Sequence, residues 1–248
     1  MPETRVPASA FALPTGEASV TEAVLLPATA TLPEFCRVRG AIAAALASDP
    51  PILFQVNLPS RWNGKTVQYG GGGYNGVVVD ATLPFKGGAL APLPLARGYA
   101  TYGSDSGHQT PGASFYDNAQ ATANYAHEAV KRSLDLSASL LKTYYGQAAS
   151  RNYHIGGSKG GHEALQAAQR YAADFDGVVS FYPAMQTQSL RLGWNRLWHF
   201  AFNPAGGALD TAKQQLLKAA VLRACDGLDG VVDGIVSNTA ACAQAFRV

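Results

Sequence analysis

The turn Gly156-Gly157-Ser158-Lys159-Gly160 constrains this chain more than any other segment. A strand-length apolar stretch, residues 152–155, precedes it, and an alanine-rich helical stretch, residues 162–173, follows it. The pattern G-x-S-x-G between a strand and a helix is typical of a nucleophile elbow, where glycines permit a sharp turn and the serine hydroxyl stands exposed. The alternative is a glycine-rich turn that binds phosphate, but the nucleotide-binding pattern G-x-x-x-x-G-K-[ST] is absent. The turn therefore favours an α/β fold with Ser158 as a nucleophile.

Further strand-length segments recur along the chain, at residues 37–42, 51–58, 66–69, 98–104 and 177–181. Residues 117–145 carry apolar side chains close to helical spacing, and Gly146 is a plausible stop. Strands that alternate with helices favour an α/β-hydrolase-type domain with a mostly parallel sheet. After Pro183 this alternation fades. We therefore expect a catalytic core over residues 1–184 and the start of a lid domain over residues 185–248.

Composition supports a sizeable core and argues against two kinds of partner. Of the 248 residues, 47% are hydrophobic and only 15% are charged, which excludes disorder of the whole chain. The net charge of +2 gives no reason to expect nucleic acid or a membrane surface as partner. No run approaches the ~20 apolar residues of a membrane helix. The first residues also lack the basic start and apolar stretch of a signal peptide.

A glycine cluster at residues 70–73 is the candidate partner of the serine turn. It follows the expected strand 66–69 directly and precedes Tyr-Asn-Gly. An elbow serine needs two backbone N–H donors for the oxyanion, one from the next residue and one from a loop after an earlier strand. We expect Lys159 and Gly72 to supply them, with Gly71 as the alternative to Gly72. A flexible hairpin tip is the other interpretation of the cluster.

An acidic, glycine-rich loop at residues 226–235 is the candidate metal site. It carries Asp226, Asp229 and Asp233, and carboxylates this close repel one another unless a cation or water separates them. Hard oxygen ligands suit Ca²⁺, although the spacing is not that of an EF-hand. A solvated acidic turn is the alternative. Cys225 and Cys242 flank the loop, so a disulfide between them would hold it; three cysteines allow one bridge and one unpaired thiol.

Taken together, these segments resemble the tannase and feruloyl esterase family of α/β-hydrolases. The resemblance covers nearly the whole chain, and the order of the segments carries it: residues 33–38, 51–58, 62–65, 70–76, the Asp-Ser-Gly-His turn at 105–108, the elbow 156–161 with Glu163, residues 174–177, and the loop 225–235 closed by Cys242. It implies an ester hydrolase for small aromatic acid esters such as gallates or ferulates. It also implies Ser158 as nucleophile, with the Lys159 and Gly72 amides as oxyanion donors.

For the acidic loop the resemblance implies a bound Ca²⁺ and a Cys225–Cys242 disulfide. The side chains of Asp226, Asp229 and Asp233 and the carbonyls of Val231 and Ile235 would be its ligands. The family also implies a secreted or periplasmic location, although no signal peptide is visible in this chain.

Two departures from the family pattern concern the catalytic machinery. Gly157 stands where the family usually has a cysteine bridged to one beside the catalytic histidine, and His162 stands where it commonly has arginine. In this fold an acid and then a histidine follow the serine, yet only His162 and His199 follow Ser158, and neither suits a base. We therefore expect either a fragment whose acid and base lie beyond Val248, or an inactive chain. A non-catalytic small-molecule-binding relative is the alternative function.

Overall fold

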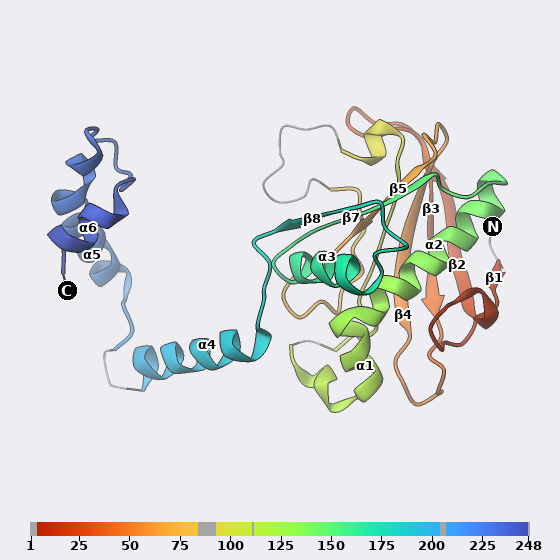
Figure 1. The fold of residues 1–248 in the computed structure, drawn as a ribbon, viewed down its shortest axis with the longest axis horizontal. Helices are drawn as coiled ribbons and strands as arrows, with labels where there is room; N and C mark the ends of the chain where they lie inside the picture. The colour runs from red at the N-terminus through yellow and green to blue at the C-terminus, as the bar shows by residue number, and fades with distance from the viewer. Residues whose placement is uncertain (1–3, 84–92, 111, 204–206, 248) are drawn as a thin grey trace. The chain divides into compact units, whose positions relative to one another are not determined.

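The computed structural model describes residues 4–83, 93–110, 112–203 and 207–247. The chain forms two compact units, Met1–Met185 and Gln186–Val248, so the division lies one residue from the boundary expected from sequence. The first unit contains the sheet, with strands β1 (Arg5–Val6), β2 (Ala18–Leu26), β3 (Phe35–Ile42), β4 (Ile52–Pro59), β5 (Lys65–Tyr69), β6 (Ala100–Ser104), β7 (Arg151–Gly157) and β8 (Gly177–Phe181) (Figure 1). Its helices are α1 (Ala119–Ala123), α2 (Ala129–Tyr145) and α3 (Lys159–Arg170). The second unit contains α4 (Thr187–Phe202), α5 (Thr211–Cys225) and α6 (Thr239–Ala245).

The sheet is mixed, with the strand order β1-β2-β3-β4-β6-β5-β7-β8. Among the described strands, four neighbouring pairs are antiparallel and three are parallel. The α/β-hydrolase-type fold is confirmed, but the expectation of a mostly parallel sheet holds only for β6, β5, β7 and β8. Strands β1 to β4 follow one another through short connections, which can join only antiparallel neighbours. The parallel half brings the carboxyl ends of β5 and β7 to one edge.

Helices α2 and α3 lie against one face of this sheet, and the main apolar core lies beneath them (Figure 1). Phe54 and Val56 on β4 and Tyr102 on β6 meet Leu136 and Leu140 on α2 in this core. Each such side chain contributes about 1.5–3 kcal/mol when it is fully removed from water. This packing anchors the central strands whose ends carry the candidate site.

The helix expected over residues 117–145 is interrupted. Asn118 caps α1 by accepting a hydrogen bond from the Ala121 amide, and a π-helical turn, Asn124–Glu128, separates α1 from α2. The sequence does not reveal this interruption. Asn124 and Tyr125 are buried in the turn, as they would be on the core-facing side of an unbroken helix. Gly146 ends α2 in the left-handed conformation (φ 73°), as expected. A π-turn inserts an extra residue and is often found at functional sites.

Candidate active site

Ser158 occupies the sharp turn between β7 and α3. Its backbone has φ 55° and ψ −116°, a conformation that costs a non-glycine residue on the order of 1–3 kcal/mol. Three backbone hydrogen bonds hold it there. The Ser158 amide donates to the Phe181 carbonyl (3.1 Å), and the Ser158 carbonyl accepts from the amides of Ala184 (2.8 Å) and His162 (3.1 Å). The side chain is exposed. The strand–turn–helix context expected from G-x-S-x-G is thus confirmed, while the role of the hydroxyl stays a prediction.

The elbow and the glycine cluster contact each other through their backbones. The Gly160 amide donates to the Gly71 carbonyl at 3.0 Å. A Cβ atom on Gly160 would lie 2.7 Å from that same oxygen, and one on Gly70 would lie 2.6 Å from the Gly160 Cα. Side chains at either position would force the two segments apart. Glycine therefore permits the close approach of two loops that are almost ninety residues apart in sequence.

A cavity of about 630 Å³ opens at this contact. Both Ser158 and the glycine cluster line it, so the structure brings together the two segments that the sequence predicted as one site. Apolar side chains form much of the remaining wall, among them Tyr69, Val79, Ala81 and Tyr182. Sequence reasoning missed this wall, because residues 78–83 carry no motif and reach the site only through the fold.

The amides of Gly71 and Gly72 differ in what they contact. The Gly71 amide donates to Oε2 of Glu163 at 3.0 Å, so it is already engaged. Within the described part of the chain, no acceptor meets the Gly72 amide, and a Cβ on Gly72 would meet no atom within 4 Å. Lys159 begins α3, and the first N–H groups of a helix have no intrahelical acceptor. The geometry therefore favours Gly72 over Gly71 as the second donor beside Lys159.

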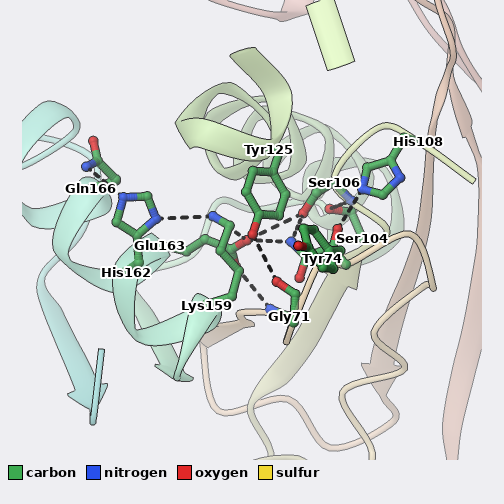
Figure 2. A network of polar contacts seen from close by, with 12 residues as sticks. Gly71, Tyr74, Ser104, Ser106, His108, Tyr125, Lys159, His162, Glu163 and Gln166 are labelled. Atoms are coloured by element: carbon green, nitrogen blue, oxygen red, sulfur yellow. Dashed lines mark hydrogen bonds and ion pairs between the residues drawn. The ribbon is translucent and has the colours of Figure 1, made fainter. Parts of the chain in front are cut away.

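Polar side chains form a buried network behind the glycine cluster (Figure 2). Glu163 lies 3.3 Å from the Lys159 ammonium, and both residues are almost fully buried. Burial alone raises the pKa of the Glu163 carboxyl, but Lys159, His154 and two hydrogen bonds outweigh it and lower that pKa below its usual value. Glu163 is therefore ionised at neutral pH. In the sequence, Glu163 belongs to the elbow segment, and its spacing of four residues from Lys159 is that of an ion pair on one face of a helix.

The turn at residues 105–108 supports the cluster from another side. The buried Asp105 carboxylate accepts from the Gly107 amide (2.8 Å), the Leu53 amide (3.1 Å) and the Gln109 side chain (2.6 Å). Burial nevertheless raises the pKa of Asp105 to about 6. The His108 ring lies 2.7 Å from the carbonyl of Tyr74, just after the glycine cluster. These contacts give His108 a structural role in the turn.

No histidine side chain in the described ranges hydrogen-bonds to the Ser158 hydroxyl. The His162 ring lies 3.2 Å from both the Lys159 ammonium and the Gln166 side-chain amide, so it packs along α3. His154 is buried within β7, where burial lowers its pKa to about 4. The structure thus supplies a candidate nucleophile and oxyanion donors, and the described residues offer Ser158 no base.

The acidic loop belongs to the second unit, where the expected Cys225–Cys242 disulfide is confirmed. Cys36 is a buried free thiol. The loop folds around its own carboxylates: Asp226 accepts from the Gly234 amide (3.0 Å), Asp229 from the Val231 amide (3.0 Å), and Asp233 from the Ile235 amide (2.9 Å).

The donor chemistry of this loop fits a hard cation such as Ca²⁺. Across the described ranges, however, no three His, Cys, Asp or Glu side chains lie close enough to hold a metal by themselves. Asp226, Asp229 and Asp233 are therefore not gathered into a ligand set in this structure, and the carbonyls of Val231 and Ile235 remain ligands that the family resemblance implies. Calcium at this loop stays a prediction.

A sheet with a strained serine turn at its carboxyl edge, beside a glycine-rich loop, defines the α/β-hydrolase class of proteins. The chain belongs to the tannase and feruloyl esterase family, because the model of that family matches residues 36–248.

Several similar proteins are named as esterases or hydrolases. An uncharacterized esterase of Agrobacterium fabrum is 40% identical over 96% of this chain and 44% of its own length. The mono(2-hydroxyethyl) terephthalate hydrolase of Piscinibacter sakaiensis is 34% identical over 89% of this chain and 41% of its own. Feruloyl esterase B of Aspergillus oryzae, a solved structure, matches with a TM-score of 0.76 and 26% identity, over 91% of this chain and 46% of its own. The chain spans less than half the length of each of these relatives.

The described helices include none with the length and apolar character needed to cross a bilayer.

Proposed function

We propose that this chain forms the nucleophile-bearing part of a serine hydrolase for aromatic carboxylic acid esters. One observation carries the proposal: the strained, exposed Ser158 and the glycine cluster 70–73 line the same cavity. Strained backbone at an exposed serine persists only where surrounding structure enforces it, and such strain clusters at active sites. The family and the esterases among the similar proteins support the same class of reaction.

In the proposed reaction, Ser158 Oγ attacks the ester carbonyl carbon and gives up its proton to a base. The carbonyl oxygen becomes an oxyanion, which the Gly72 and Lys159 amides stabilise by hydrogen bonds. The carbon–oxygen bond to the alcohol then breaks, the alcohol leaves with a proton, and the acyl group stays on Ser158. Water attacks this acyl-enzyme and releases the acid. Because no described histidine side chain hydrogen-bonds to the Ser158 hydroxyl, we propose that the base comes from outside the described residues.

We propose that the acyl group carries a single aromatic ring, and the size and lining of the cavity are evidence for this. Its volume of about 630 Å³ lies in the usual range for small-molecule sites, and apolar side chains such as Val79 and Ala81 form part of its wall. Two similar proteins are named for esters of aromatic acids, a feruloyl esterase and the mono(2-hydroxyethyl) terephthalate hydrolase.

We also propose Ca²⁺ at the acidic loop, and a secreted or periplasmic location, where the Cys225–Cys242 disulfide would persist.

The test is hydrolysis of methyl ferulate and methyl gallate by the full-length protein that contains this chain. Ser158→Ala should lower kcat by at least about 10³-fold, because the nucleophile is lost. Ser139→Ala on α2, which removes a hydroxyl bonded only to the helix backbone, is the matched control and should remain active. Full activity in Ser158→Ala would refute the proposal. Binding of ferulate without any turnover by the unaltered protein would favour a non-catalytic relative instead.

A further inference from the structure

Glu163 connects the elbow helix to the glycine cluster from behind. It lies one turn after Lys159 on α3 and is only 4% exposed. Its Oε2 accepts from the Gly71 amide (3.0 Å) and its Oε1 from the Asn75 side chain (2.7 Å) (Figure 2). Lys159, 3.3 Å away, supplies the balancing charge. One carboxylate therefore contacts the loop that contains the glycine cluster at both Gly71 and Asn75, and it also contacts Lys159, the residue after Ser158.

Tyr125 holds the same loop at a third point. Its hydroxyl donates to the Gly73 carbonyl at 2.9 Å, and its ring centre lies 4.3 Å from the Lys159 ammonium (Figure 2). Tyr125 comes from the π-helical turn before α2. The bonds at Gly71, Gly73 and Asn75 leave the Gly72 amide between them, with no acceptor among the described residues.

The buried Lys159–Glu163 ion pair carries a large desolvation penalty. Removing two charges from water costs several kcal/mol per ion, and well-packed apolar residues often stabilise a fold equally well. Here the ionised carboxylate does what an apolar side chain could not, because it accepts the Gly71 amide and the Asn75 side chain together. The Lys159 backbone amide is itself a proposed oxyanion donor, so the pair connects one donor residue to the Gly71 amide, which directly precedes the other donor, Gly72.

We propose that Glu163 is a positioning residue for ester hydrolysis: it engages the Gly71 amide, and with Lys159 it fixes the loop so that the Gly72 amide faces the oxyanion. This inference rests on the proposed function. The preorganised loop then needs no rearrangement as negative charge develops, which is where oxyanion donors gain their effect.

The test uses Glu163→Gln in the full-length protein, with 4-nitrophenyl benzoate and its thionobenzoate analogue as substrates. Glutamine keeps the shape and one acceptor oxygen but loses the charge. We expect kcat for the oxygen ester to fall about 10- to 100-fold with KM nearly unchanged, since a lost oxyanion donor costs about 10²–10³-fold. Sulfur is a weak acceptor, so the thiono ester gains little from these amides and should slow far less. The oxygen-to-thiono rate ratio should therefore fall.

Two further variants separate positioning from folding. Asp135→Asn removes one ion-pair partner of the buried Lys131 at the same spacing on α2, away from the glycine cluster, while Lys131 keeps its pair with Asp174. It should lower stability modestly and leave the rate ratio unchanged. The double variant Lys159→Met/Glu163→Gln removes both charges, so its unfolding midpoint should recover toward that of the unaltered protein while the ratio stays low.

An unchanged ratio in Glu163→Gln, an equal fall in Asp135→Asn, or recovery of the ratio together with stability in the double variant would each overturn the positioning role. Ser158→Ala, assayed alongside, separates this outcome from failure of the proposed function. If Ser158→Ala hydrolyses both esters at the unaltered rate, the serine mechanism itself is wrong.

Discussion

Replacing Gly160 with alanine should separate the elbow from the glycine cluster. The new Cβ would lie 2.7 Å from the Gly71 carbonyl oxygen and 2.9 Å from the Gly70 carbonyl carbon, both of them backbone atoms. Ordinary contact requires roughly 3.4 Å or more, so the loop must move by more than half an ångström. Overpacking of this kind costs about 1–3 kcal/mol. A shift of this size at the oxyanion donors should also lower kcat by about 10-fold or more.

Gly193→Ala is the matched control, because Gly193 is also helical and its added Cβ would meet no atom within 4 Å. This control should gain up to about 1 kcal/mol from helix propensity alone. Urea unfolding followed by circular dichroism gives the free energies of unfolding of Gly160→Ala and Gly193→Ala. The difference between them isolates the steric cost of the added Cβ at position 160. If Gly160→Ala is as stable as Gly193→Ala and keeps full activity, the close contact between elbow and loop is wrong.

Three other measurements test separate parts of the structure. Burial raises the pKa of Asp105 to about 6, so the folded protein holds this proton more tightly than the unfolded chain does. The free energy of unfolding should therefore fall as the pH rises, by about 3 kcal/mol in total from below pH 4 to above pH 6. Urea titrations should show that Asp105→Asn lacks this loss, and identical pH dependence in both proteins would contradict it. Calcium at a hundred times its Kd should stabilise the acidic loop by about 2.7 kcal/mol. Calorimetry should show that this added stability disappears with a chelator or in Asp229→Asn. A stability that does not change with calcium would refute the metal proposal. Replacing Cys225 and Cys242 with serine should destabilise the second unit by about 3 kcal/mol, read from its unfolding transition, and no change would show that the bridge constrains nothing.

Local sequence patterns predicted the parts of this fold that depend on near neighbours. The strand–turn–helix at Ser158, the end of α2 at Gly146 and the strand before the glycine cluster all follow from spacing and from glycine's conformational freedom. The Cys225–Cys242 bridge followed from the family resemblance, and the structure contains it.

Features that depend on distant contacts could not be predicted in the same way. The sequence already favoured Gly72 over Gly71, but the physical reason depends on Glu163, which lies about ninety residues further along the chain and, of these two amides, accepts only that of Gly71. The π-helical turn at Tyr125 has an apolar pattern like that of an ordinary helix. The cavity wall at residues 78–83 has neither motif nor periodicity, so only the folded chain reveals it.

The most direct measurement is to treat the full-length protein with a fluorophosphonate and to find the labelled residue by peptide mass spectrometry. Such reagents form a covalent bond only with an activated nucleophile whose developing oxyanion is stabilised. We expect the label on Ser158 alone, and none in Ser158→Ala. Stoichiometric labelling of a different residue, with Ser158 unmodified, would contradict the assignment of this turn as the nucleophile.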